Sequence, residues 1–220
     1  QRLAGKRRQE IERLVQTDPP FVALKQYLPE IYKDTLRAIE AQVKTPPAEK
    51  AVFIHEARGR SAFLLAFDDR LKIASDEAVA AYAAALVGAA DELGKRDPKL
   101  CVVYLYRGTV GRQNFATLLS AAAQKAEAAA MAEILKSSVT APQPRASSAL
   151  DGEVYRILRP VMDGLFKEFG HEWNIIHRPL AKDVDSAKLC SITAAYYREI
   201  LDLSAAEAGT VLRRQLRSHS

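Results

Sequence analysis

The sequence has few of the residue types that usually mark a metal centre. Its 220 residues include only two cysteines, four histidines and one tryptophan. A zinc-protease helix needs two histidines four positions apart with a glutamate between them. Here His171 and His177 lie six positions apart, and His55 has no second histidine near it. The spacing that zinc requires is therefore absent, and we predict no metal ion.

Motifs for nucleophilic catalysis and phosphate binding are also missing. The segment 106–112 contains two glycines, but it lacks the Lys-Ser/Thr ending of a phosphate loop and follows no predicted strand. A reactive cysteine needs a positive, partly exposed setting and a base, whereas both cysteines lie in apolar helical contexts. The adjacent carboxylates of Asp68 and Asp69 are candidates for an acid–base pair, but they fit a solvated helix face better. We therefore predict no catalytic residue and no cofactor.

Long apolar runs are absent too. No stretch of eighteen apolar residues occurs, so the sequence predicts no membrane-spanning helix, and no signal-peptide core is present. The chain begins at Gln1 rather than Met. We therefore expect a fragment or a processed product, with a signal or an anchoring helix as the natural candidate for the upstream part.

What the chain does contain is typical of a globular protein, with 48% hydrophobic and 27% charged residues. The net charge is +5, and the first thirteen and last ten residues carry it. Basic ends on a nearly neutral body are a weak sign of nucleic-acid binding, so we do not predict a nucleic-acid partner. Two interpretations of the basic ends remain: they are solvated tails, or they lie near the anionic headgroups of a membrane.

The pattern favours an all-α fold. Alanine is abundant, runs of Val, Ile and Thr are few, and start signals recur at Asp18-Pro19, Ser75, Asp97-Pro98 and Ser204. We predict a multi-helix bundle of about eight to ten helices with no β-sheet. Its longest uninterrupted helix is predicted from Arg112 to Lys136.

A Ser/Pro-rich stretch divides the chain. Residues 138–149 have no hydrophobic periodicity and are predicted to form a linker. Residues 1–137 then form the main helical bundle, and residues 150–220 form C-terminal helices that pack on the same bundle.

The two cysteines lie in similar segments on either side of this linker. Each segment has an aspartate that can cap a helix, then Lys-Leu-Cys, then aromatic residues and an arginine. We predict that the two helices lie side by side and that Cys101 and Cys190 form a disulfide. Such a bridge would indicate an oxidising compartment. Two buried free thiols in a cytosolic protein are the alternative.

The compartment signals conflict. A disulfide favours an extracytoplasmic protein, periplasmic or secreted, with a membrane anchor upstream of Gln1 as an option. If an anchoring helix preceded Gln1 closely, however, Arg2, Lys6, Arg7 and Arg8 would favour a cytoplasmic location. We give the cysteines more weight and keep a cytoplasmic location as the alternative.

One charged residue interrupts an apolar stripe. Residues 48–74 are predicted to be helical, and Arg60 lies in the centre of a stripe formed by Phe53, Ala57, Leu64, Phe67 and Leu71. Arg60 can pair with Glu56 one turn earlier, or it can hold an anionic ligand or a partner's carboxylate. The candidate ligand-binding residues are therefore Arg60, Tyr104, Tyr106, Trp173 and Tyr197.

Two functional hypotheses follow. The first is a non-enzymatic helical binding or interaction domain, the soluble part of a membrane-anchored or exported protein, whose protein partner or small ligand the sequence does not identify. The second is a cytosolic helical enzyme or small-ligand binder with a pocket around Arg60 and the tyrosines. No motif resembles a known family closely enough to choose between them.

Overall fold

The computed structural model describes residues 2–42, 50–58, 61–107, 113–145 and 151–216. These residues form eleven α-helices and two 3-10 segments, with no β-strand, so the predicted all-α fold is confirmed with one helix more than the expected range. The helices are α1 (Arg2–Val15), α2 (Pro19–Tyr27), α3 (Pro29–Gln42), α4 (Lys50–Arg58), α5 (Ser61–Leu71), α6 (Asp76–Arg96), α7 (Pro98–Leu105), α8 (Ala121–Thr140), α9 (Asp151–Phe169), α10 (Ser186–Leu201) and α11 (Ala205–Gln215). The 3-10 segments are η1 (Phe115–Thr117) and η3 (Gly170–His177).

Serine caps set several helix starts. The side chains of Ser75 and Ser204 accept hydrogen bonds from backbone N–H groups three residues later, as the sequence predicts. The Ser120 side chain likewise accepts a hydrogen bond from the Ala123 N–H, and α8 begins at the next residue, Ala121. The prediction of one continuous helix from Arg112 is therefore wrong, because a 3-10 turn and this cap precede Ala121.

Within the predicted helix over residues 48–74, the structure describes two helical segments, α4 and α5. Residues 59–60 lie outside the described residues. Whether Arg60 pairs with Glu56 or holds an anionic ligand or a partner's carboxylate therefore stays a prediction. Asp18 stands at the N-cap position of α2, but its side chain makes no cap hydrogen bond. It binds Arg58 instead.

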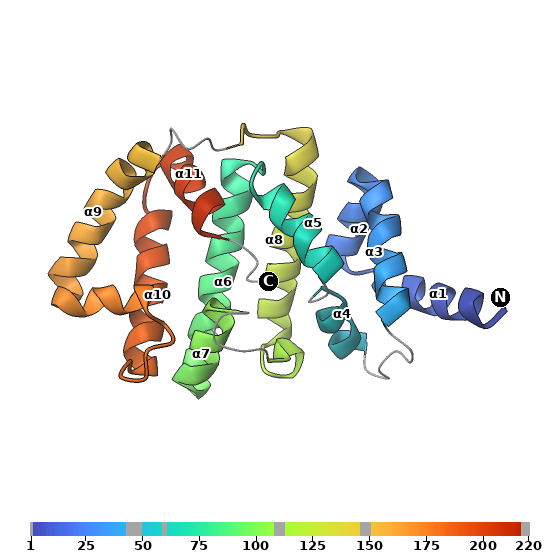
Figure 1. The fold of residues 1–220 in the computed structure, drawn as a ribbon, viewed down its shortest axis with the longest axis horizontal. Coiled ribbons are helices and arrows are strands. Elements are labelled where there is room, and N and C mark those ends of the chain that lie inside the picture. The colour runs from blue at the N-terminus through green and yellow to red at the C-terminus, as the bar shows by residue number, and fades with distance from the viewer. Residues whose placement is uncertain (1, 43–49, 59–60, 108–112, 146–150, 217–220) are drawn as a thin grey trace.

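The helices pack along an elongated molecule, and their order in space differs from their order in the chain (Figure 1). α1 lies at one end, α9 lies at the other, and α6 and α8 lie in the middle (Figure 1). α8 packs against α2, α5 and α6, and α6 also packs against α7, α10 and α11. The larger core contains large buried side chains from most helices, among them Phe21, Phe53, Phe63, Phe67, Ile134 and Leu135. A smaller core surrounds Cys101.

The predicted linker begins as part of a helix. Residues 138–140 belong to the last turn of α8, and the hydroxyl of Ser138 is buried and donates to the Leu135 carbonyl at 2.7 Å. After the helix, the Gln143 N–H donates to the Ile73 carbonyl at 2.8 Å, which holds this part of the segment against the end of α5. Residues 146–150 lie outside the described residues.

α11 approaches α6 very closely. Gly209 faces the Asp76 side chain, and a β-carbon added at Gly209 would lie 2.8 Å from the Asp76 β-carbon. Asp76 in turn accepts a 2.6 Å bond from Nη1 of Arg213, which also donates to the Ala74 carbonyl at 3.1 Å. Glycine therefore permits an approach that this ion pair then holds in place.

Candidate functional site around the disulfide and the Arg107–Glu127 pair

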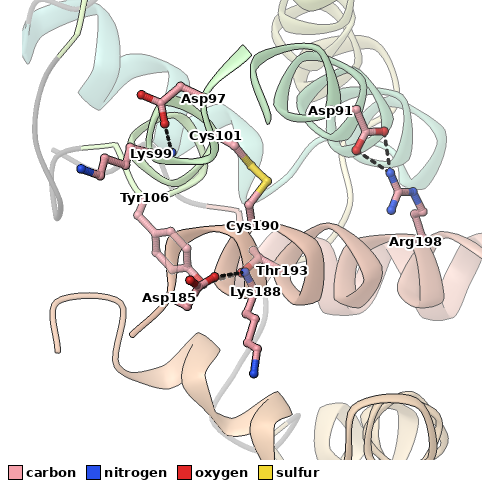
Figure 2. Close-up of a disulfide and its surroundings, with 10 residues drawn as sticks. All are labelled: Asp91, Asp97, Lys99, Cys101, Tyr106, Asp185, Lys188, Cys190, Thr193 and Arg198. Atoms are coloured by element: carbon pink, nitrogen blue, oxygen red, sulfur yellow. Dashed lines mark hydrogen bonds and ion pairs between the residues drawn. A yellow bond between two sulfur atoms is a disulfide. The ribbon is translucent and has the colours of Figure 1, made fainter. Parts of the chain in front are cut away.

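A disulfide ties α7 to α10. Cys101 and Cys190 are bonded, with their α-carbons 5.8 Å apart, as the sequence predicts (Figure 2). Both helices begin at capping aspartates, since Asp97 accepts from the Lys99 N–H at 2.9 Å and Asp185 from the Lys188 N–H at 2.8 Å. The two similar segments therefore lie side by side, each starting as its sequence indicates.

The disulfide also packs against α6. A β-carbon added at Gly94 would lie 3.2 Å from the Cys190 sulfur and 3.6 Å from the Cys101 β-carbon, so the bridge occupies the space beside this glycine. On the same pair of helices, Arg198 of α10 donates to Asp91 of α6 at 2.6 Å (Figure 2). Three helices meet at this point, which makes the bridge a structural joint.

Tyr106 connects this joint to η3. Its hydroxyl lies 2.8 Å from Thr193 Oγ1 (Figure 2). It also donates to the Ile176 carbonyl at 3.3 Å. Burial raises the pKa of Tyr106, and the hydrogen bond with Thr193 partly offsets that effect. The phenol therefore stays protonated and acts as a hydrogen-bonded link between α7, α10 and η3.

Three of the five candidate ligand-binding residues belong to this region. Tyr106 bonds to both η3 and α10, Trp173 lies on η3 with its ring 5.5 Å from that of His177, and Tyr197 lies on α10. The pKa of Tyr197 is raised by burial first and then by the neighbouring tyrosines, including Tyr106. Trp173 and Tyr197 both pack against the larger core.

Tyr104 belongs to a different set of contacts. It is buried in the smaller core, where its ring lies 5.0 Å from Phe115, and the Arg107 guanidinium lies 3.9 Å above the Tyr104 ring. Burial and the charge of Glu127 raise the pKa of Tyr104 well above its ordinary value. A neutral phenol thus sits beside a buried ion pair.

That ion pair is the main feature which the sequence did not reveal. Arg107 Nη2 donates to Glu127 Oε1 at 2.8 Å, and the two side chains are 33% and 10% exposed. Burial has the largest single effect and would raise the pKa of Glu127, but the charge and hydrogen bond of Arg107, together with the Arg58 charge, outweigh it and the pKa falls below its ordinary value. For Arg107, burial favours the neutral form, yet the charge and hydrogen bond of Glu127, together with Tyr104 and Tyr82, more than compensate and the pKa is raised. Both groups remain charged.

His55 joins α4 to η1 beside this pair. Its Nε2 lies 3.3 Å from the Gln113 carbonyl and 3.4 Å from the Phe115 N–H, which can donate to it. The pKa of His55 is lowered, mainly by burial and then by the Arg107 charge. The imidazole is therefore neutral at neutral pH and can accept from Phe115.

A second ion pair anchors α4. Arg58 donates through Nε to Asp18 Oδ2 at 3.1 Å and through Nη2 to Asp18 Oδ1, which makes a bidentate pair. The Asp18 side chain is 4% exposed and that of Arg58 18%. No sequence signal could have found these pairs, because their members lie 40 and 20 positions apart. Local spacing rules cover only neighbours on one helix.

Other site classes find no support in the described part of the chain. It contains no group of three or more His, Cys, Asp or Glu side chains placed to hold a metal ion. Within the same residues, no helix combines the length and apolar character that crossing a membrane requires. A shallow depression is lined by Gln16, Phe21, Val22, Lys25, Gln26 and Tyr32, away from the disulfide.

Comparison with known proteins returns nothing. No protein-family profile, no curated protein and no solved structure matches this chain.

Proposed function

We propose that this chain is a non-enzymatic helical interaction domain, the soluble part of an exported or membrane-anchored protein that works in an oxidising compartment. The Cys101–Cys190 disulfide is the observation that carries the proposal. Disulfides persist in secreted and periplasmic proteins and are rare in the reducing cytosol. The only two cysteines of the chain are both used in this bridge.

The interaction role is supported by the exposed surface of α9, which lies at one end of the molecule (Figure 1). Tyr155 and Phe166 on α9 are 66% and 48% exposed. Aromatic side chains are enriched at the centres of protein interfaces, where they bury a large area with little loss of side-chain freedom. The ionised side chains of the candidate site, in contrast, pair with each other, as Arg107 does with Glu127, which fits a structural role for them.

The compartment is tested by the state of the thiols in native cells. N-ethylmaleimide is added before lysis, and the protein is analysed by mass spectrometry without reduction. We expect Cys101 and Cys190 to be recovered as one linked peptide pair without alkylation. Recovery of both cysteines in alkylated form would contradict the proposal, because it would place the folded chain in a reducing compartment.

The interaction role is tested by photo-cross-linking. A benzophenone amino acid replaces Tyr155, and in a control variant it replaces Leu65, which is 61% exposed on α5. We expect discrete cross-linked products from position 155 in intact cells and none from position 65. Identical patterns from the two positions would contradict an interaction surface on α9.

A further inference from the structure

α9 lies at the edge of the molecule (Figure 1). It packs against α10, α11 and η3. The residues that make this packing follow one stripe of the helix and are buried, namely Val154, Ile157, Val161 and Leu165. The remaining side of the helix faces solvent.

Two aromatic side chains stand on this exposed side, three turns apart. Tyr155 and Phe166 are eleven positions apart, which at 3.6 residues per turn brings them back to nearly the same direction. Phe166 is covered in part by His171, whose ring lies 5.1 Å away, and about half of its surface remains open. The helix thus presents an aromatic group near each end of its outer face.

Two opposite charges lie between the aromatic groups. Arg159 and Asp163 are one turn apart, both exposed, and within the described residues neither has an ion-pair or hydrogen-bond partner. Several exposed ion pairs among the described residues are formed within one turn, such as Lys33–Glu30 and Lys136–Glu133. The charges of Arg159 and Asp163 are instead both open to a group from outside.

The two pairs share one centre. The midpoint between Tyr155 and Phe166 and the midpoint between Arg159 and Asp163 differ by half a residue, which is less than about 1 Å at a rise of 1.5 Å per residue. A two-fold axis through that point turns the helix end for end. It then places Tyr155 opposite Phe166, and Arg159 opposite Asp163, of a second copy. The outer face of α9 is therefore complementary to itself.

We propose that α9 binds α9 of a second copy of this chain in an antiparallel, two-fold symmetric pair. Each contact occurs twice, which is the property of an isologous interface. The two aromatic contacts supply apolar area, and the two Arg159–Asp163 contacts fix the register. The inference rests on the proposed interaction role and names its partner.

A membrane surface fits this face less well. Arg156, Arg159 and Lys167 would favour anionic lipid, but Asp163 lies among them and would meet phosphate groups of its own sign. A second copy provides a partner for the acid as well as for the base. One helix per chain is a small contact, so we expect a reversible dimer with a dissociation constant on the order of 10 µM or weaker.

The test exchanges the charges one at a time. Sedimentation equilibrium is measured for the oxidised wild-type protein and for the R159D and D163R variants. Each variant alone places like charges opposite each other in both contacts, so we expect its dissociation constant to rise about tenfold or more. Mixing the two variants in equal amounts restores two opposite-charge contacts, and we expect the mixed dimer to return close to wild-type affinity.

Two controls separate this result from general effects. R37D makes the same charge change on α3, at a site 65% exposed, and we expect no change in association. Circular dichroism confirms that each variant keeps its helix content. A wild-type chain that stays monomeric at several hundred micromolar overturns the inference, as does a mixture that associates no better than its components. Binding to anionic vesicles by a monomeric chain would overturn it in favour of the membrane.

The two proposals fail in different ways. A monomeric protein isolated with an intact disulfide would remove the dimer and leave the oxidising compartment in place. A dimeric protein whose cysteines are both alkylated in native cells would exclude the oxidising compartment and leave the dimer in place.

Discussion

Reduction of the Cys101–Cys190 bridge offers the sharpest test of the fold. The bonded residues are 89 positions apart in sequence. In the chain-entropy model, closing a loop of that length removes about 15.5 cal/mol/K from the unfolded chain, which corresponds to about 4.6 kcal/mol at 25 °C. The free energy of unfolding should fall by about that amount on reduction, since the bridge mainly restricts the unfolded state.

The assay is urea unfolding followed by circular dichroism, with and without a phosphine reductant. For a chain of this size we expect the thermal midpoint to fall by roughly 9–18 °C as well. The denaturant slope should increase, because an uncrosslinked chain exposes more surface. The variant with both cysteines replaced by alanine serves as the control, and its stability should not respond to the reductant.

The reasoning would be refuted by a specific outcome. Thiol titration must first show that both cysteines are free in the reduced sample. If the free energy of unfolding then changes by less than about 1 kcal/mol, the bridge does not constrain the unfolded chain as the loop length predicts. The joint between α6, α7 and α10 would then be held by packing alone.

Three further perturbations test particular contacts. Gly209→Ala forces a β-carbon into the Asp76 side chain, and we expect a loss of about 2–3 kcal/mol in urea unfolding. Glu127→Ala leaves the guanidinium of Arg107 without its partner; we expect a loss of about 2 kcal/mol, below the value for fully buried pairs because a third of the Arg107 side chain reaches solvent. The pKa of His55 is lowered in the folded protein, so below pH about 6.5 the unfolded chain binds more protons. Stability should therefore fall as the pH drops from about 6.5 through the folded pKa, by at most about 1.4 kcal/mol per pH unit.

Matched variants give each of these results a control. Gly88 lies exposed in α6 with nothing within 4 Å of an added β-carbon, so Gly88→Ala should raise stability by up to about 1 kcal/mol. Equal effects at Gly88 and Gly209 would contradict the close approach of α11. Glu133→Ala, at an exposed pair on α8, should cost less than about 1 kcal/mol. His55→Gln should remove the acid dependence assigned to His55, and an unchanged pH profile would contradict that assignment.

Part of the fold could be predicted because its signals are local. The caps Ser75 and Ser204 act within one turn of their helices, as the sequence predicts. Pro29 likewise begins α3, because proline fits the first position of a helix. Local rules failed at Ser120, because the stretch before it has apolar residues at helical spacing but forms a 3-10 turn packed around Phe115. Hydrophobic spacing alone cannot decide between these two conformations.

The candidate site was less predictable. The disulfide could be predicted, because there are only two cysteines and their sequence contexts match. The ion pairs Arg107–Glu127 and Asp18–Arg58 could not be predicted, because their members lie 20 and 40 positions apart in the chain. Of the five candidate binding residues, Tyr106, Trp173 and Tyr197 belong to the α10 region, Tyr104 faces the ion pair, and Arg60 lies outside the described residues.

By itself, the sequence determined the helical class, several helix starts and the pair of cysteines available for bonding. These properties depend on neighbours within a few residues, which the order of amino acids specifies directly. Only the tertiary structure decided which charges are buried together, how closely α11 approaches α6, and which side of α9 stays uncovered. These properties depend on how helices from distant parts of the chain pack, and no local pattern encodes that arrangement.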